Sequence, residues 1–295
     1  MHILMTGGTG FIGEALVPHL ITRGHRLTLL SRARHADTET CRYVQNLSEL
    51  ASGEQVDVAI NLAGASLAGA RWTPAYKREI VDSRLDTTAD LIACMQRLQN
   101  PPSLLLNASA IGFYGHGDTP VTETAGAGEG FSAELCQQWE AAAQHAEALG
   151  TRVCLTRFGV VLDAGGGAFE ELYRPFRFGV ANWIGNGRQW LSWVHRKDVV
   201  AALEFLIEHQ DISGPVNITA PEPVTSKDMC SAIKAFRKTL FTAPVPAPVM
   251  RIMLGEMADE LLIHGQRVLP ERLKQNGFTF TYPTIGTALH AIFAR

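Results

Sequence analysis

The stretch HILMTGGTGFIG, residues 2–13, decides the fold of this 295-residue chain. Its first five residues form an apolar run that stops at glycines, which is typical of a short buried strand. Residues 14–23 then show helical spacing closed by Gly24, and residues 26–31 form a second apolar run. The stretch therefore predicts a βαβ unit, whose crossover places both strands parallel in one sheet.

The glycines of this stretch are spaced as G-x-x-G-x-x-G. A pyrophosphate needs backbone N–H donors at the start of a helix and no Cβ atom in its way, and a strand–loop–helix context provides both. We therefore expect a nicotinamide dinucleotide on this loop. The expected contact residues are Gly7, Thr9, Gly10, Phe11, Ile12 and Gly13.

The end of the second strand predicts which dinucleotide binds. An acidic residue at this position accepts hydrogen bonds from the adenosine ribose, whereas a 2'-phosphate requires positive charge. Here the strand ends in Ser31 and Arg32. A guanidinium can pair with the phosphate and stack on adenine, so NADP(H) is favoured over NAD.

Further apolar strands are expected at residues 56–63, 103–109 and 152–157, with helices at 74–99 and 132–149 between them. Strands of this kind alternating with helices predict an α/β fold with a Rossmann-type doubly wound parallel sheet. We expect residues 1–160 to form the NADP-binding domain and residues 161–295 a smaller substrate-side lobe. Segments near 195–220 are expected to return to the main sheet.

The pattern changes after residue 157. Three glycines at 165–167 precede an aromatic and basic stretch at 169–193, which we interpret as loop and lid material. A helix is expected at about 197–209 and a strand at 215–219. Thr225 and Asp228 fit a capping box that opens a helix through about residue 238.

Composition excludes several classes of protein. The net charge is −3, 46% of the residues are apolar and no basic cluster points to nucleic acid. No apolar stretch is long enough to span a membrane, and the histidines lack metal-ligand spacing, so we expect no membrane segment and no metal. The lack of such a stretch, and of a basic region ahead of the first strand, leads us to expect a cytoplasmic protein. The five cysteines are scattered and odd in number, which favours reduced thiols.

At this point the chain resembles the extended short-chain dehydrogenase/reductases, in the branch often labelled epimerase family protein. The resemblance covers essentially the whole chain, and its motifs mark the fold and branch more specifically than they mark a reaction. It implies that the backbone of Leu62 and Ala63 passes beside the adenosine ribose, with Gly64, Glu79, Arg84 and Val161 as further cofactor contacts. It also implies a homodimer through helices near 80–97 and 132–149. The motifs that carry it are residues 6–13, Asn61–Gly64, Trp72, Ser83–Arg84, 184–188, Trp193–His195 and 265–270.

The catalytic segment departs from that family's pattern. Ser109 fits the serine that orients the substrate oxygen. Phe131 and Leu135, however, stand where the helix should carry the Tyr and Lys of Y-x-x-x-K, and no Tyr in the chain has Lys four residues on. The standard acid/base pair is therefore absent.

Tyr114 and His195 are the candidate substitutes. Tyr114 lies five residues past Ser109 on the loop that leaves the strand's carboxyl end, where ligands sit in doubly wound sheets. Without a neighbouring cation its pKa should stay near about 10, so the phenol would donate a proton more readily than accept one. Alternatively, Tyr114 packs with Phe113 and His195 makes a structural hydrogen bond.

Three functions follow in order of preference. The first is an NADP(H)-dependent oxidoreductase that reduces a carbonyl of a small-molecule substrate. The second is a catalytically impaired regulatory protein that senses NADP(H), which the missing Tyr and Lys make credible. The third is a nucleotide-sugar epimerase, which the same absence disfavours because epimerisation requires proton removal.

Overall fold

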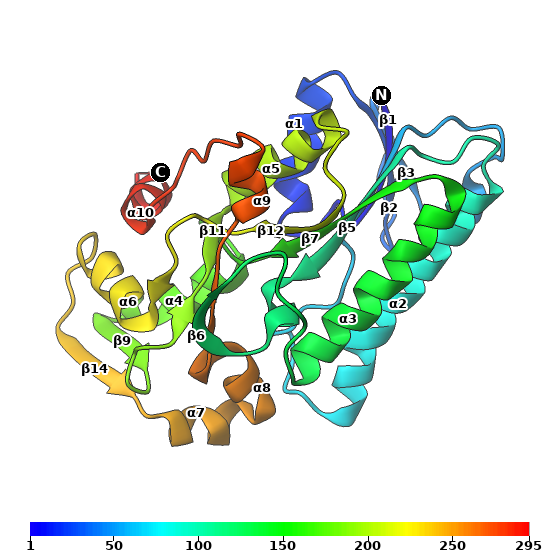
Figure 1. Ribbon diagram of the computed structural model, residues 1–295. Helices are drawn as coiled ribbons and strands as arrows, with labels where there is room; N and C mark the ends of the chain where they lie inside the picture. Colours follow the sequence, from blue (N-terminus) through cyan, green and yellow to red (C-terminus); the bar gives the residue numbers. More distant parts are fainter. Residues whose placement is uncertain (295) are drawn as a thin grey trace.

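The computed structural model describes residues 1–294, and its centre is a seven-stranded sheet (Figure 1). Its strands are β1 (His2–Thr6), β2 (Arg26–Leu30), β3 (Cys41–Val44), β4 (Val58–Asn61), β5 (Leu104–Ala110), β7 (Arg152–Phe158) and β12 (Gly214–Ile218). Their order is β12-β7-β5-β4-β1-β2-β3, and every neighbouring pair is parallel. This arrangement confirms the predicted Rossmann-type doubly wound α/β fold.

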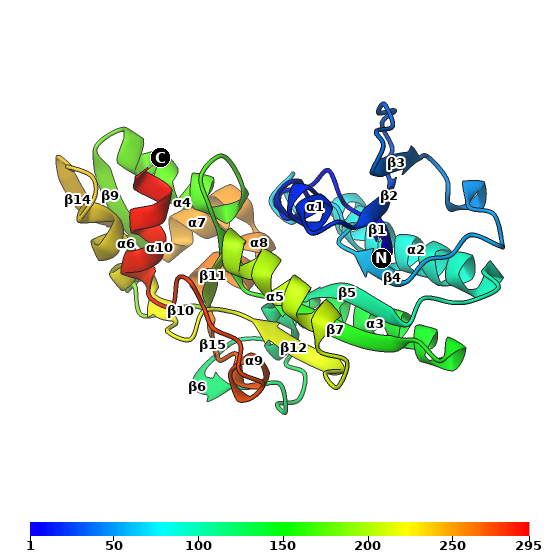
Figure 2. The ribbon, with the colours of Figure 1, turned by 90° about the horizontal axis from the view of Figure 1, so that it is seen from above.

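Helices cover both faces of this sheet because the strand residues alternate between them. Ile3 and Met5 of β1 pack in the cluster that also contains the apolar residues of α1 (Gly13–Thr22) and α5 (Arg196–Glu208). Leu4 packs on the opposite side, in the cluster that contains residues of α2 (Pro74–Arg97) and α3 (Phe131–Gln144). Figures 1 and 2 show α2 and α3 side by side.

A second group of elements packs beside the carboxyl ends of the strands (Figure 2). Its core contains Trp193, Phe169, Phe176 and Leu289, all buried. The elements are β6 (Gly117–Val121), β8 (Val160–Leu162), α4 (Gly167–Arg177), β9 (Val180–Ile184), β10 (Trp190–Leu191), β11 (Trp193–His195), β13 (Val224–Thr225), α6 (Ser226–Lys234), β14 (Phe241–Val245), α7 (Ala247–Leu254), α8 (Glu256–Ala258), β15 (Gln266–Val268), α9 (Glu271–Gln275) and α10 (Ile285–Phe293). Short turns of other helix types lie at Leu47–Glu49, Ile111–Tyr114, His145–Leu149 and Asp259–Ile263.

The interpretation of residues 165–193 as loop and lid material is wrong. Helix α4 and strands β9 and β10 occupy most of this stretch. Phe169 and Phe176 are both buried on α4, so tertiary packing outweighs the low helix propensity of the glycines and of Pro175. The capping box at Thr225 and Asp228 is confirmed, but its helix ends at Lys234 instead of residue 238.

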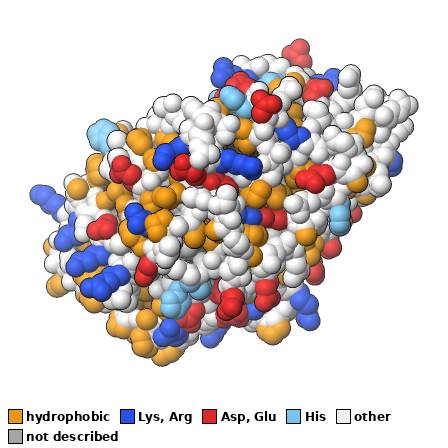
Figure 3. All heavy atoms as spheres, viewed as in Figure 1, with side chains coloured by type: hydrophobic (Ala, Val, Ile, Leu, Met, Phe, Trp, Pro, Cys, Tyr) orange, Lys and Arg blue, Asp and Glu red, His pale blue; other side chains and the backbone are white. Residues whose placement is uncertain are grey.

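The surface of the smaller group of elements carries exposed apolar side chains, which gather around α7 and β14 (Figure 3). They include Phe178, Leu240, Phe241, Ile252 and Met253. No helix within residues 1–294 is both long and apolar enough to cross a membrane.

Candidate functional site

The glycine-rich loop joins β1 to α1 at the carboxyl edge of the sheet. Gly7 adopts a φ of +71°, and a Cβ atom on it would lie 2.5 Å from the backbone carbon of Leu62, so only glycine fits this turn. The Gly10 N–H donates to the Gly7 carbonyl over 3.0 Å. A Cβ atom on Gly13 would lie 2.4 Å from the same carbonyl oxygen. The first and third glycines are therefore required by the close packing of the loop itself.

The loop leaves the start of α1 open to a ligand. No side chain caps this helix, and Thr9 and Gly10 are exposed while Phe11 and Ile12 are partly exposed. A helix N-terminus presents unpaired N–H groups and a partial positive charge, which suit a phosphate. The residues present therefore fit a pyrophosphate.

The segment after β4 runs directly against this loop. The Leu62 N–H donates to the Thr6 carbonyl over 3.1 Å, and the Ala63 N–H donates to Thr6 Oγ1 over 3.3 Å. Thr6 Oγ1 in turn donates to Asn61 Oδ1 over 2.6 Å, deep in the protein. The backbone of Leu62 and Ala63, predicted to pass the adenosine ribose, is thereby fixed relative to the glycine loop.

Arg84 lies beside this segment. Its guanidinium carbon would be 2.9 Å from a Cβ atom on Gly64, and Nη1 donates to the Ile80 carbonyl over 2.9 Å. Burial lowers the pKa of this guanidinium. Glu79 is exposed on α2, and Val161 is partly buried on β8, opposite Val194 of β11.

The residues predicted to select NADP(H) follow β2. Ser31 is buried and its N–H donates to the Val44 carbonyl over 3.0 Å, whereas Arg32 is exposed. The Arg32 carbonyl accepts a hydrogen bond from Gln45 Nε2. Within the described residues the Arg32 side chain enters no ion pair, so its charge is available to an anion.

Ser109 and Tyr114 belong to one buried polar network. Ser109 Oγ donates to Glu140 Oε1 over 2.6 Å, and the Tyr114 hydroxyl donates to Asn217 Oδ1 over 2.7 Å. Arg157 joins the two halves, because it pairs with Glu140 over 2.7 Å and donates to the Tyr114 hydroxyl over 2.9 Å. Both predicted catalytic hydroxyls therefore have partners inside the protein.

The premise that Tyr114 has no neighbouring cation is wrong. The Arg157 guanidinium is in hydrogen-bond contact with the phenol and favours its ionised form. Burial nevertheless dominates and raises the pKa of Tyr114 above its ordinary value, against the lowering effects of Arg157 and Asn217. The phenol is therefore protonated at neutral pH, as expected, although for a different reason.

His195 is fully buried where β11 enters α5. Its Nδ1 accepts the Lys197 N–H over 3.1 Å and so caps the helix, and its ring lies 4.0 Å from that of Tyr282. The nearby Asp198 accepts the N–H groups of Thr281 and Tyr282, each over 2.9 Å. Burial raises the pKa of Asp198 although these bonds oppose the rise.

The positions of the absent Tyr and Lys are filled by apolar packing. Phe131 and Leu135 belong to a cluster with Trp72 and Met257, in which the Trp72 and Phe131 rings are 5.0 Å apart. Lys77 Nζ lies 4.2 Å from the centre of the Phe131 ring and pairs with Glu256 over 2.8 Å. This end of α3 is therefore closed by side chains from α2 and α8.

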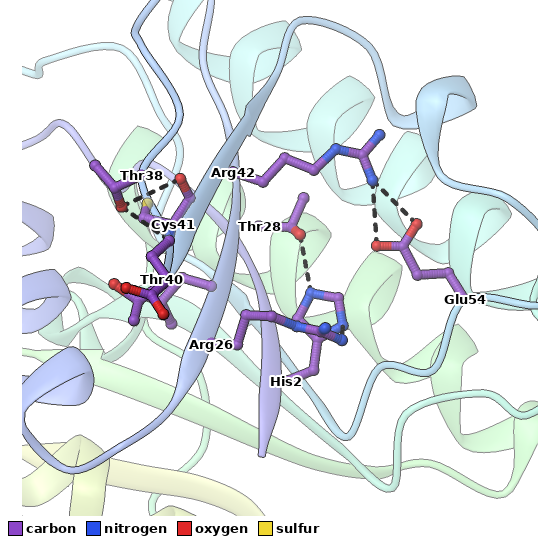
Figure 4. A pocket seen from close by; sticks show the side chains of 10 residues that line it. His2, Arg26, Thr28, Thr38, Thr40, Cys41, Arg42 and Glu54 are labelled. Atoms are coloured by element: carbon purple, nitrogen blue, oxygen red, sulfur yellow. Dashed lines mark hydrogen bonds and ion pairs between the residues drawn. The ribbon is translucent and has the colours of Figure 1, made fainter.

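A cavity of about 330 Å³ lies at the amino ends of the strands, opposite the end that carries the glycine loop (Figure 4). It is lined by the first residues of β1, β2 and β3, including His2 and Arg26. Arg42 pairs with Glu54 at its rim, and His2 Nε2 is 2.9 Å from Thr28 Oγ1. This cavity is remote from the glycine loop and does not belong to the predicted site.

Sequence reasoning missed the charged partners of the site. Glu140 and Arg157 are separated by 17 positions, and Asp163 and Arg196 by 33. No motif marks either pair. Only the arrangement of α3, β7, β8 and α5 in space brings them together. Arg174 and Arg177 pair with Glu171 and Glu170 on α4.

Comparison with known proteins agrees with this geometry. Residues 3–219 match the family model described as NAD dependent epimerase/dehydratase family, and residues 245–292 match a domain of unknown function. The epimerase family protein YfhF of Bacillus subtilis is 40% identical over 301 residues, which cover 100% of this chain and 98% of YfhF. The epimerase family protein ML0860 of Mycobacterium leprae is 38% identical and covers 97% of this chain and 94% of its own length.

Solved structures give the same result. The human epimerase family protein SDR39U1, crystallised with NADPH, superposes with a TM-score of 0.90 at 32% identity over 100% of both chains. A nucleoside-diphosphate sugar epimerase from Corynebacterium glutamicum has a TM-score of 0.80 at 30% identity, over 99% of this chain and 58% of that one. On the strength of these matches, the chain belongs to the NAD dependent epimerase/dehydratase family.

Proposed function

We propose that this protein binds NADP(H) across the glycine-rich loop and reduces a carbonyl group of a small molecule. Two features together carry the proposal: no side chain caps the start of α1 at the end of the glycine-rich loop, and the guanidinium of Arg32 is exposed. The first fits the pyrophosphate and the second fits a 2'-phosphate. The human relative crystallised with NADPH supports the same cofactor.

The cofactor would supply the hydride, and the chain's own residues would hold it and provide a proton. Arg84 and the backbone of Leu62–Gly64 would border the adenosine side, with Val161 and Glu79 as further contacts. Ser109, Tyr114 and His195 remain the proposed catalytic residues. A protonated Tyr114 suits proton donation to a developing alkoxide better than proton removal, which favours reduction over oxidation.

Fluorescence titration with NADPH and NADH tests the cofactor. We expect NADPH to bind at least about tenfold more tightly than NADH, because a charged phosphate contact contributes about 1.5 to 3 kcal/mol. Arg32→Ala should remove this preference and leave NADH affinity unchanged. Arg26→Ala is the matched control, since Arg26 is exposed at the other end of β2. NADPH binding that does not weaken in Arg32→Ala would refute the assignment.

A regulatory protein that senses NADP(H) without turnover is the second candidate. It is favoured by the internal partners of Ser109 and Tyr114 and by the apolar packing of Phe131 and Leu135. A screen of carbonyl compounds that follows NADPH absorbance separates the two functions. If no compound in the screen causes NADPH consumption although NADPH binds tightly, the sensor is favoured. Conversion of a nucleotide sugar without net NADPH consumption would favour an epimerase.

We also propose a cytoplasmic location, which is supported by the five free and buried cysteines of the chain. The homodimer through helices near 80–97 and 132–149 stays a prediction of the family resemblance. Light scattering on the purified protein would measure it.

A further inference from the structure

Phe11, in the middle of the glycine-rich loop, is held by residues far away in the sequence. Its carbonyl accepts a hydrogen bond from Arg196 Nη1 over 3.1 Å, and the Arg196 guanidinium carbon lies 4.5 Å from the centre of its ring. The same guanidinium donates through Nε to Asp163 Oδ2 over 2.8 Å. The Arg196 side chain therefore contacts Phe11 both by a hydrogen bond to its carbonyl and by a cation–π contact with its ring. Asp163 fixes the position of the guanidinium.

The ion pair of Arg196 and Asp163 is buried enough to hold the guanidinium in one orientation. The side chain of Asp163 is only 2% exposed and that of Arg196 17%. Asp163 Oδ1 also accepts the N–H of Ala164 over 2.7 Å, which restricts the carboxylate further. A planar guanidinium can stack and donate from several edges at once, whereas an ammonium group cannot. The three contacts of Arg196 thus depend on its being arginine.

The triple-glycine segment also lies against the Phe11 ring. A Cβ atom on Gly166 would lie 2.9 Å from a ring carbon of Phe11, and one on Gly167 would lie 2.6 Å from another. A side chain at either position would therefore require the Phe11 ring to move. The segment at 165–167, which the proposed function leaves unexplained, therefore has the shape of a seat for Phe11.

We propose that Arg196 and Asp163, with the glycine seat, are positioning residues that hold the glycine-rich loop in the conformation that receives the pyrophosphate. This inference rests on the proposed binding of NADP(H). Arg196, which contacts Phe11, is the first residue of α5, and Asp163 is the residue after β8. The loop of the first βαβ unit is thereby tied to segments that also support the smaller lobe.

Two measurements on Arg196→Met test the proposal, since methionine keeps an apolar stem without the guanidinium. Hydrogen exchange of residues 7–13 in the cofactor-free protein should become faster. The Kd for NADPH should rise about tenfold, as expected if the loop keeps its binding conformation only about a tenth of the time. Arg196→Lys should restore little of either, because lysine can pair with Asp163 but cannot also stack and donate to Phe11.

Arg23→Met is the matched control. Arg23 pairs with Glu204 and so ties α1 to α5 as well, but at the far end of α1 from the glycine loop. It should leave loop exchange and NADPH affinity unchanged. Equal effects of Arg23→Met and Arg196→Met would overturn the proposal, because general docking of α5 on α1 would then explain both.

The exchange measurement separates this inference from the proposed function. If the wild-type protein fails to bind NADPH but loop exchange still accelerates in Arg196→Met, the proposed cofactor is wrong and the positioning of the loop stands. If the wild type binds NADPH and Arg196→Met matches it in affinity and exchange, the positioning role is wrong. Full recovery of both properties in Arg196→Lys would also contradict it.

Discussion

Arg157 is the residue on which the polar side chains beneath the site converge. Its Nε and Nη2 donate to the two oxygens of Glu140 over 2.8 and 2.7 Å, and its guanidinium carbon lies 3.4 Å from the centre of the Phe113 ring. The remaining Nη1 donates to Tyr114. Buried charges are stable only with such partners, so Arg157 fixes the orientation of both Glu140 and the phenol.

The Tyr114→Phe variant separates the structural role of this phenol from a catalytic one. Loss of the hydroxyl leaves the Asn217 oxygen and one Arg157 N–H without their partner. We therefore expect the free energy of unfolding, measured by urea titration, to fall by about 1 to 3 kcal/mol. NADPH-dependent turnover of the folded variant tests proton donation: a fall of about a hundredfold or more agrees with it. Undiminished turnover would contradict the catalytic role.

The sequence predicted the neighbourhood of these residues but not their partners. Ser109 and Tyr114 follow from their position at the end of a recognisable apolar strand. Arg157 looks like an ordinary strand end, because nothing local indicates that it meets a phenol 43 positions earlier. The glycine loop was predictable for the opposite reason, since the strand, the glycine spacing and the helix that mark it all lie within one short stretch.

At the scale of elements, α1 and α5 are joined at their exposed edge by Glu204. This carboxylate accepts hydrogen bonds from Arg23 Nε and, over 2.8 Å, from His19 Nε2. Burial alone would raise the pKa of Glu204, but the bonds from Arg23 and His19 outweigh it and lower the pKa below the ordinary value of 4.5. The folded protein therefore stabilises the ionised form of Glu204 relative to the protonated form.

This lowered pKa predicts a dependence of stability on pH. The stabilisation is complete above pH 4.5 and is lost as the pH falls through the lower folded pKa. Glu204→Gln should therefore lower the free energy of unfolding at pH 7, with the difference from wild type shrinking towards about pH 3. Glu208→Gln, one turn further along α5 and exposed, is the control. A difference that stays constant across this range would contradict the assignment.

The predictability of the elements follows their local signals. The unit β1–α1–β2 combines a continuous apolar run, helical spacing and glycine stops, and all three elements form. The strand β3 (Cys41–Val44) was missed because it is only four residues long, comes after a polar stretch, and has two partly exposed residues. Helix α4 was missed because glycines and Pro175 mask the spacing of its buried Phe169 and Phe176.

At the scale of the whole molecule, the C-terminal part packs on the N-terminal half at the start of α3. Met257 joins Trp72 and Phe131 in one cluster, and Glu256 pairs with Lys77. These contacts cover the end of α3 where the family's acid/base pair would otherwise begin. Because these contacts join the two parts of the chain, we expect it to unfold in a single cooperative transition.

Glu260 tests this dependence directly, because it caps a helix from the other half of the chain. Its two carboxylate oxygens accept the N–H groups of Phe131 and Ser132 over 3.2 and 3.1 Å, at the first turn of α3. Glu260→Ala should lower the free energy of unfolding by about 1 kcal/mol, as loss of a helix N-cap does. Glu260→Gln keeps an acceptor and should lose less.

The control for Glu260 is Asp259→Ala, since Asp259 is adjacent but pairs with Arg251 at the surface. That change should be close to neutral, because exposed ion pairs contribute little. Urea denaturation followed by both tryptophan fluorescence and circular dichroism should give coincident transitions in wild type and in Glu260→Ala, with only the midpoint displaced. Two separate transitions in Glu260→Ala would mean that the C-terminal part folds apart from α3, and the interpretation of Glu260 as a cap that unites the halves would be wrong.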